Sequence, residues 1–174
     1  VFDMGLQTTG NVWVDVESKS ELHIDIGYAD HLQHGRVNPM LQNHFFADRI
    51  ILGSGRQRVH LPMDRGFRYV QLTFSSAAIV HAFHVAEHVY PADEVVRFHS
   101  SDATLNAVWQ LAVDTAHQCS IWSHVDNARR ERQGWGGPDL YAQMHGFFHL
   151  RGDLRLTRKM LEDFLDCADV DGFI

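Results

Sequence analysis

The sequence contains few cysteines and no long apolar run. Its two cysteines, Cys119 and Cys167, are too few for a disulfide framework, and either one bridge or, more simply, two buried thiols would account for them. A helix that crosses a membrane needs about 18 consecutive apolar residues, and the chain contains no such stretch. The sequence therefore predicts neither a disulfide-stapled domain nor a transmembrane helix.

The chain also lacks an excess of basic residues. Its formal net charge is −7 and its isoelectric point is near 6.0, whereas nucleic-acid-binding proteins usually carry a basic balance or stripe. The dense basic cluster of Arg129, Arg130 and Arg132 alternates with acidic residues. We therefore expect neither a nucleic-acid partner nor a membrane partner.

Metal ligands at a suitable spacing are scarce. His145 and His149 stand four residues apart, so one face of a helix could carry both imidazoles. No Glu follows His145 directly, and no third ligand is evident nearby. We expect no metal site and no cofactor.

Neither end of the sequence is typical of the end of a complete protein. It begins at Val1 without an initiator methionine or a charged-then-apolar leader, and it stops at Ile174 within a turn signal. We expect an internal piece of a longer protein. The compartment, which could be cytoplasmic or secreted, and the oligomeric state are left open.

The first half of the chain has the period of β-strands, in which apolar and polar residues alternate. Strands are expected over residues 12–17, 22–26, 48–52, 68–74 and 79–90. A turn is expected at 18–20 and a hairpin turn at 53–55, whereas 28–45 is polar, rich in histidine and predicted as a long loop. Several short strands separated by turns indicate a β-sandwich.

Near Pro91 the period changes to that of helices. Ser100 or Ser101 can cap a helix that begins around Asp102, and Gly152 is expected to end a second helix before Asp153 caps a third. The apolar stripes of these three helices are Leu105, Val108, Trp109, Ala112 and Ala116, then Leu140, Met144, Phe147 and Phe148, then Met160, Leu161, Phe164, Leu165 and Ala168. Strands followed by helices predict two domains, at residues 1–92 and 93–174.

Residues 126–139, between the first two helical patterns, are too polar for a core. This segment contains three carboxylates, three arginines, a tryptophan and three glycines. Hydrolysis of a sugar linkage needs a carboxylic acid that protonates the leaving oxygen, and an aromatic face can pack against the sugar ring. The segment therefore predicts a glycoside hydrolase site.

The same segment resembles the motif of the bacterial-type α-L-rhamnosidases, the six-hairpin glycosidases of glycoside hydrolase family 78. Their pattern is roughly Asp-Cys-Pro-x-Arg-x-Glu-Arg-x-x-Trp-x-Gly-Asp, and a form one residue shorter before the Glu matches at Asp126, Arg130, Glu131, Arg132, Gly134, Trp135 and Gly137. The resemblance continues in the same order along most of the chain, at residues 2–5, 10–12, 66–70, 98–109 and 171–172. It implies the C-terminal part of a β-sandwich accessory domain at 1–92, followed at 93–174 by the first helices of an (α/α)6 catalytic barrel.

The resemblance also implies a mechanism and roles for individual residues. An inverting α-L-rhamnosidase releases terminal α-L-rhamnose from a glycoside or oligosaccharide with one carboxylic acid and one carboxylate base. Glu131 would be the general acid, Asp126 would bind the rhamnose hydroxyls, Arg130 would orient the carboxylates, and Trp135 would line the sugar site. The family's base lies on a later barrel helix, so we expect it beyond residue 174 and expect this piece alone to be inactive.

The sequence departs from the family pattern at two places. Asn127 and Ala128 replace Cys-Pro, and Pro138 stands where the family has a sugar-binding Asp. Either Asp139, one position later, takes over that contact, or the contact is lost. This departure leaves two alternatives open: a six-hairpin glycosidase for another sugar, such as a uronic acid or arabinose, and a carbohydrate-binding relative without turnover.

Each predicted site residue also has a plainer interpretation. Glu131 would be a surface acid paired with Arg129 or Arg132, Asp126 a helix cap or loop acid, and Trp135 a core residue. Because the surrounding motif matches, we favour the site interpretation for all three.

Overall fold

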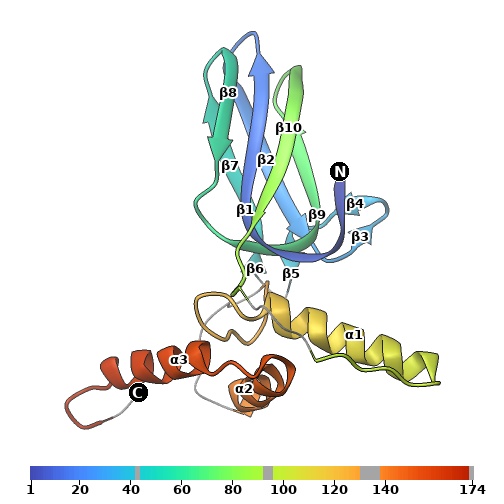
Figure 1. Cartoon of the computed structure of the whole chain (residues 1–174). Coiled ribbons are helices and arrows are strands. Elements are labelled where there is room, and N and C mark those ends of the chain that lie inside the picture. Colours follow the sequence, from blue (N-terminus) through green and yellow to red (C-terminus); the bar gives the residue numbers. More distant parts are fainter. Residues whose placement is uncertain (42–43, 92–95, 130–137, 173–174) are drawn as a thin grey trace. The chain divides into compact units, whose positions relative to one another are not determined.

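The protein is described here by a computed structural model, which covers residues 1–41, 44–91, 96–129 and 138–172 (Figure 1). The chain divides into two compact units, Val1–His88 and Val89–Ile174. Within the described ranges, none of the helices combines the length and the apolar character that crossing a membrane would require. The predicted domain boundary at 92 and 93 lies outside the described residues and stays a prediction.

The first unit is built from β-strands. They are β1 (Phe2–Ser18), β2 (Leu22–Ala29), β3 (Leu32–Gln33), β4 (Arg36–Val37), β5 (Met40–Leu41), β6 (His44–Phe45), β7 (Ala47–Leu52), β8 (Gly55–His60), β9 (Arg65–Phe74) and β10 (Ala78–Glu87). Among the described residues, six of them form one antiparallel sheet in the order β10-β1-β9-β2-β7, with β8 paired to β1. The predicted strands are therefore confirmed, although the last one ends at Glu87.

The sheet folds over because β1 changes partners along its length. Phe2 to Gly10 pairs with β9, whereas Gly10 to Ser18 pairs with β10 and, from Trp13 onward, with β8 as well. The register shifts between Asp3 and Thr8, where Gly5 has a φ of 81° and donates its N–H to Asp3 Oδ1 at 2.8 Å. The result is a sandwich-like arrangement around one core.

Alternation along the strands decides which side chains fill this core. Every second residue points inward from Val12 to Val16 of β1 and from Leu22 to Tyr28 of β2, and side chains of β9 complete the set. Its fully buried members are Val12, Val14, Val16, Leu22, Ile24, Ile26, Tyr28, Phe67 and Val70. Each such side chain contributes about 1.5 to 3 kcal/mol to folding by leaving water.

Two short links join strands that are not paired with each other in the described sheet. Residues 19–21 connect β1 to β2, and residues 53–54 connect β7, which pairs with β2, to β8, which pairs with β1. The turn predicted at 53–55 is thus present, but the described pairings do not make it a hairpin. Both links instead carry the chain from one half of the folded sheet to the other.

Residues 28–45 were predicted as a loop, and this prediction is wrong in part. The segment contains the end of β2 and two small hairpins, β3–β4 and β5–β6. Tyr28 N–H donates to Phe46 O at 3.0 Å, and Phe46 N–H donates to Pro39 O at 2.8 Å, which fixes the base of the second hairpin. Strands of two residues are too short to produce a periodic sequence pattern, so the sequence could not reveal them.

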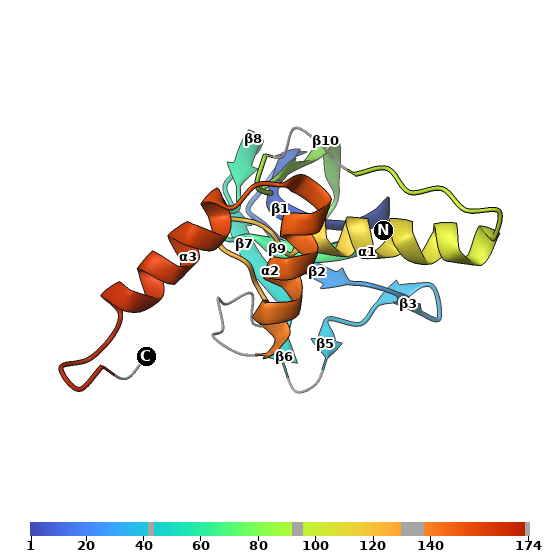
Figure 2. The ribbon, with the colours of Figure 1, turned by 60° about the horizontal axis from the view of Figure 1, so that its bottom comes forward.

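The second unit contains α1 (Ala103–Gln118), α2 (Pro138–Arg151) and α3 (Arg155–Asp166) in its described ranges. Figure 2 shows α1 and α3 extending in opposite directions from α2. The N-cap of α1 is Asp102, whose Oδ1 accepts a hydrogen bond from Thr104 N at 2.7 Å. Ser100, one of the two predicted caps, instead accepts a hydrogen bond from Asp102 N with its Oγ. Gly152, at a φ of 64°, ends α2 as predicted.

Burial on the helices departs from the predicted stripes. On α1, Leu105 and Val108 are exposed, whereas Val113 is buried. On α3, the buried residues are Leu156 and Met160. The other predicted members of the α3 stripe are exposed or partly buried: Leu161, Phe164, Leu165 and Ala168. Helical period identifies an apolar face, but whether a partner covers that face is decided by tertiary structure.

The two cysteines differ in burial. Both are free thiols; Cys119 is buried and Cys167 is exposed. The alternative of a bridge between them is thus wrong for this structure, and the interpretation as two buried thiols holds for Cys119 alone.

Candidate functional site

The structure describes the predicted site unevenly. Asp126 has a described side chain. Glu131, Arg130 and Trp135 lie outside the described residues, and Asp139 is described through its backbone, in the first turn of α2. The part of the candidate site that the structure describes is therefore Asp126 and the segment around it.

That segment, residues 119–129, follows α1 directly and has a small core of its own. Its buried apolar side chains are Cys119, Ile121, Val125 and Ala128. Val125 N–H donates to Cys119 O at 2.9 Å, and Ser120 and His124 form an isolated antiparallel bridge. We call residues 119–129 the anchor loop, because these contacts make it compact.

Polar contacts tie the anchor loop to each described helix. Ser120 Oγ donates to Ala116 O of α1 at 2.8 Å, and Gln143 Nε2 of α2 donates to Cys119 O at 2.7 Å. His124 Nε2 lies 3.0 Å from Thr157 Oγ1 of α3. A segment held on three sides gives Asp126, which lies within it, a rigid support, as a binding or catalytic site requires.

His124 is the buried centre of this network, with 0% of its surface exposed. Its Nδ1 lies 3.3 Å from Ser120 Oγ, and its ring stands edge-on to Phe147 at 5.0 Å between centroids. Burial lowers the pKa of His124 to about 4, because a charged imidazole would be desolvated there. The ring is therefore neutral near pH 7, and each nitrogen faces one hydroxyl group.

Asp126 lies near the end of the anchor loop and is half-buried. Asn127 Nδ2 donates to Asp126 Oδ2 at 2.6 Å, while Asn127 Oδ1 accepts from Arg129 N at 3.1 Å. No described helix begins here, so the structure does not support a cap role for Asp126. A carboxylate held in this way can accept hydrogen bonds from the hydroxyl groups of a ligand.

The thiol of Cys119 lies close to this carboxylate. Burial, and after it the charge of Asp126, raise the pKa of Cys119 to about 11. The thiol is therefore protonated at neutral pH and serves packing. Ala128, one of the two residues that replace Cys-Pro of the family pattern, is buried beside it, so this replacement contributes to the core of the anchor loop.

Sequence analysis did not identify the residues that hold the anchor loop. Ser120, His124, Gln143 and Thr157 have no regular spacing, and they come together through tertiary structure. A histidine within a stretch that has no Asp, Glu, Lys or Arg, residues 119–125, was the available signal. In the described parts of the chain no group of three or more His, Cys, Asp or Glu residues could hold a metal ion.

The sequence matches a known family over its first unit. Residues 1–90 match the family model described as the bacterial alpha-L-rhamnosidase concanavalin-like domain. A comparison with curated proteins gave no match.

Solved structures similar to the chain extend the comparison beyond the first unit. A family 78 rhamnosidase of Bacillus sp. GL1 has a TM-score of 0.83 and 26% identity over 92% of this chain and 17% of its own. A rhamnosidase from Klebsiella oxytoca with rhamnose bound has a TM-score of 0.80 and 19% identity over 94% of this chain and 35% of its own. An alpha-L-rhamnosidase from Dictyoglumus thermophilum has a TM-score of 0.77 and 20% identity over 97% of this chain and 20% of its own.

At these identities the second and third structures show a shared fold alone, and the chain spans 17% to 35% of the length of the three. The family match, in contrast, covers more than half of the sequence. With its sandwich-like sheet followed by helices, the chain belongs to the bacterial α-L-rhamnosidase family of glycoside hydrolases.

Proposed function

We propose that this chain is part of an inverting α-L-rhamnosidase that removes terminal α-L-rhamnose from glycosides or oligosaccharides. Family membership and the matched motif support this assignment. In this proposal Glu131 is the general acid that protonates the glycosidic oxygen. A carboxylate base on a later barrel helix, roughly 6.5 to 9.5 Å from the acid, activates water on the opposite face of the sugar.

The observation that carries the proposal is the attachment of the anchor loop to three helices. Hydrogen bonds of Ser120, His124 and Gln143 attach the loop, which contains Asp126, to α1, α3 and α2 respectively. Such support suits a binding residue, because a carboxylate that is already oriented loses little entropy when it accepts a sugar hydroxyl. We assign Asp126 to binding the rhamnose hydroxyls on this ground.

The remaining roles follow from positions in the motif. Arg130 orients the carboxylates, and Trp135 packs against the sugar ring. Pro138 and Asp139 begin α2, where proline is well accommodated and a carboxylate is favoured by the helix dipole. Pro138 therefore has a structural reason to stand where the family has Asp, and we propose that Asp139 supplies the sugar contact instead.

We also propose the domain assignment that the family implies. Residues 1–92 are the C-terminal part of a β-sandwich accessory domain, and residues 93–174 are the N-terminal part of the (α/α)6 catalytic domain. The order of a sandwich-like sheet followed by helices supports this assignment.

The test is hydrolysis of p-nitrophenyl α-L-rhamnoside by the full-length protein, beside a panel of other p-nitrophenyl sugars. Glu131→Gln is expected to lower kcat by about 100- to 10,000-fold with folding preserved, because it removes general acid catalysis. Asp126→Asn is expected to raise KM. Glu162→Gln, which changes an exposed acid paired with Arg158 on α3, is the matched control and should leave both constants unchanged.

Pro138 keeps the two alternative functions open. A six-hairpin glycosidase for another sugar would hydrolyse a uronide or arabinoside in the panel and leave the rhamnoside intact. A carbohydrate-binding relative would bind rhamnose and hydrolyse none of the sugars. Either result would overturn the proposed specificity.

A further inference from the structure

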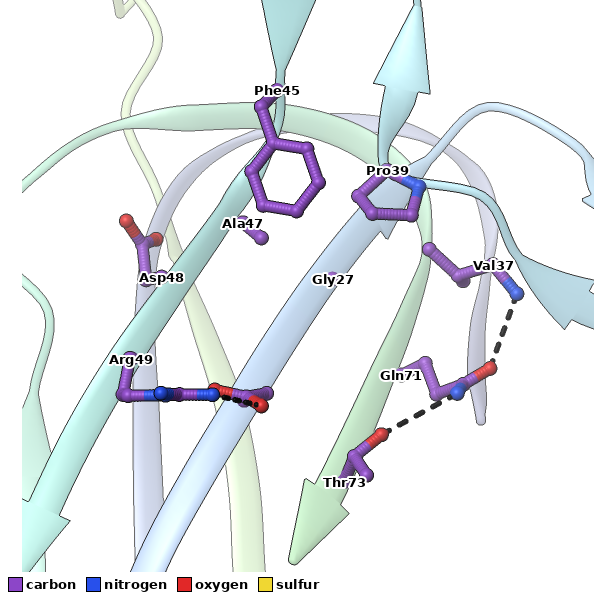
Figure 3. Close-up of a pocket in the computed structure, with 10 residues that line it drawn as sticks. Gly27, Val37, Pro39, Phe45, Ala47, Asp48, Arg49, Gln71 and Thr73 are labelled. Atoms are coloured by element: carbon purple, nitrogen blue, oxygen red, sulfur yellow. Dashed lines mark hydrogen bonds and ion pairs between the residues drawn. The ribbon is translucent and has the colours of Figure 1, made fainter.

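The β-unit contains a pocket of about 430 Å³ on the outer side of β2, β7 and β9 (Figure 3). Its volume lies within the range of about 300 to 1,000 Å³ that is typical of small-molecule sites. The residues that line it are Asp25, Gly27, Val37, Pro39, Phe45, Ala47, Asp48, Arg49, Gln71 and Thr73. None of them belongs to the rhamnosidase motif.

The floor of the pocket is made of two small residues. Gly27 of β2 and Ala47 of β7 face each other in register, so the floor carries little side-chain bulk and Val37 and Pro39 can pack against Gly27. A Cβ placed on Gly27 would approach Val37 Cγ1 to 3.2 Å and Pro39 Cβ to 3.8 Å. An added methyl group would thus crowd Val37, and this wall of the pocket would have to shift.

The walls are fixed by hydrogen bonds before any ligand enters. Gln71 Oε1 accepts from Val37 N at 3.1 Å, which attaches β4 to β9. On the opposite side, Arg49 Nε and Nη2 donate to the two carboxylate oxygens of Asp25 at 2.5 and 2.7 Å. Preformed walls lower the entropic cost of binding.

The lining combines an apolar surface with planar polar groups. Figure 3 shows the Phe45 ring beside the Pro39 ring, with Arg49 and the Gln71 amide lower in the view. Phe45 is 64% exposed although it is a large apolar residue. An aromatic ring that faces solvent at the mouth of a polar pocket can stack on the C–H face of a sugar, whose hydroxyls then reach the amide and the ion pair.

Charge pairing selects among polar ligands. The charged residues that line the pocket are Asp25, Asp48 and Arg49. Asp25 forms an ion pair with Arg49, and Asp48 forms an ion pair with Arg65, so each of these charges is neutralised by a partner. A phosphate would meet carboxylates, and a cation would meet guanidinium groups. A neutral ligand with several hydroxyls avoids both repulsions.

We propose that this pocket is a second carbohydrate site, which binds one neutral sugar ring away from the catalytic motif. Phe45 provides the stacking surface, and Arg49, Asp25, Gln71 and Thr73 provide hydrogen bonds. A site of this kind would hold a polysaccharide or a branched glycoside near the enzyme without taking part in bond cleavage. It does not depend on the proposed activity.

The test is calorimetric titration of the full-length protein with methyl α-L-rhamnoside, methyl α-D-glucoside and methyl β-D-galactoside. The protein should carry Asp126→Ala and Glu131→Gln, so that the proposed catalytic site cannot bind or consume the probe. In this background at least one sugar is expected to bind. Phe45→Ala is expected to weaken that binding about fivefold through loss of stacking, and Gly27→Ala is expected to weaken it as well.

Ile51→Ala is the matched control, because Ile51 is a similarly exposed apolar residue on β7 that does not line the pocket. It should leave the affinity unchanged, and circular dichroism should show that all variants are folded. Absence of binding by every sugar, or equal affinity in the Phe45→Ala and Ile51→Ala variants, would overturn the proposal. Because the background is inactive by design, these outcomes are independent of whether the enzyme hydrolyses rhamnosides.

Discussion

Burial of His124 makes the stability of the protein depend on pH between about pH 6.5 and pH 4. An ordinary histidine has a pKa near 6.5, and in this structure burial lowers that of His124 to about 4. The unfolded chain therefore binds a proton at a higher pH than the folded chain does. It follows that stability is fully present above about pH 6.5 and falls as the pH decreases toward 4.

The size of the effect follows from the same two pKa values. Each pH unit in this window corresponds to about 1.4 kcal/mol, so the free energy of unfolding should fall by about 2.5 kcal/mol between neutral pH and pH 4.5. Carboxylates whose pKa is lowered, such as Asp153, lose their contribution only below about pH 4, which is outside this range.

The assay is urea denaturation followed by circular dichroism at several pH values between these limits. His124→Gln removes the titrating group while its amide can still bond to Ser120 and Thr157, so its unfolding free energy should change with pH by about 2.5 kcal/mol less than that of the parent. Leu111→Ala, which changes an exposed side chain without a titrating group on α1, is the control and should keep the parent's dependence. Identical pH dependence of the parent and His124→Gln would refute the reasoning.

Three further changes test the packing of each unit by urea denaturation. Gly10→Ala should lower the unfolding free energy by more than about 2 kcal/mol, because its Cβ would stand 2.1 Å from Ala86 O on the neighbouring strand β10; stability equal to the parent would contradict this close approach. Asp102→Ala should cost about 1 kcal/mol by removing the cap of α1, and Asp102→Asn should restore most of it. Phe147→Ala should cost about 3 to 5 kcal/mol, since Phe147 is 1% exposed and contacts Tyr90 and His124; a loss no larger than that of the exposed Phe148→Ala would argue against this packing.

The sequence predicted the parts of the fold that leave a periodic pattern. Alternation located the buried valines of β1, and the 3.6-residue period with Gly152 located α2. It could not show that β1 pairs with β8, β9 and β10, because strand pairing is decided by contacts between residues far apart in the chain. Helical period likewise did not show that Leu105 and Val108 on α1 would be exposed.

The candidate site was predicted from a motif, and the structure describes its surroundings. Asp126 was found because it belongs to a dense polar segment that matches a family pattern. The groups that hold the anchor loop, His124 above all, have no such pattern, since a buried polar residue is recognised by its partners and not by its neighbours in sequence. The pocket beside Phe45 was not predicted for a related reason: Gly27 and Ala47 come to face each other only once two strands are in register.

The central position of β1 has a consequence for synthesis of the protein. β1 is made first, yet its partners β8, β9 and β10 are all made later, and the last of them ends at Glu87. Because pairing between distant segments is slow and has to close a long loop, this topology has a high contact order. The nascent β-unit therefore cannot complete its core until its final strand has left the ribosome, and until then the unpaired edges of β1 are open to aggregation.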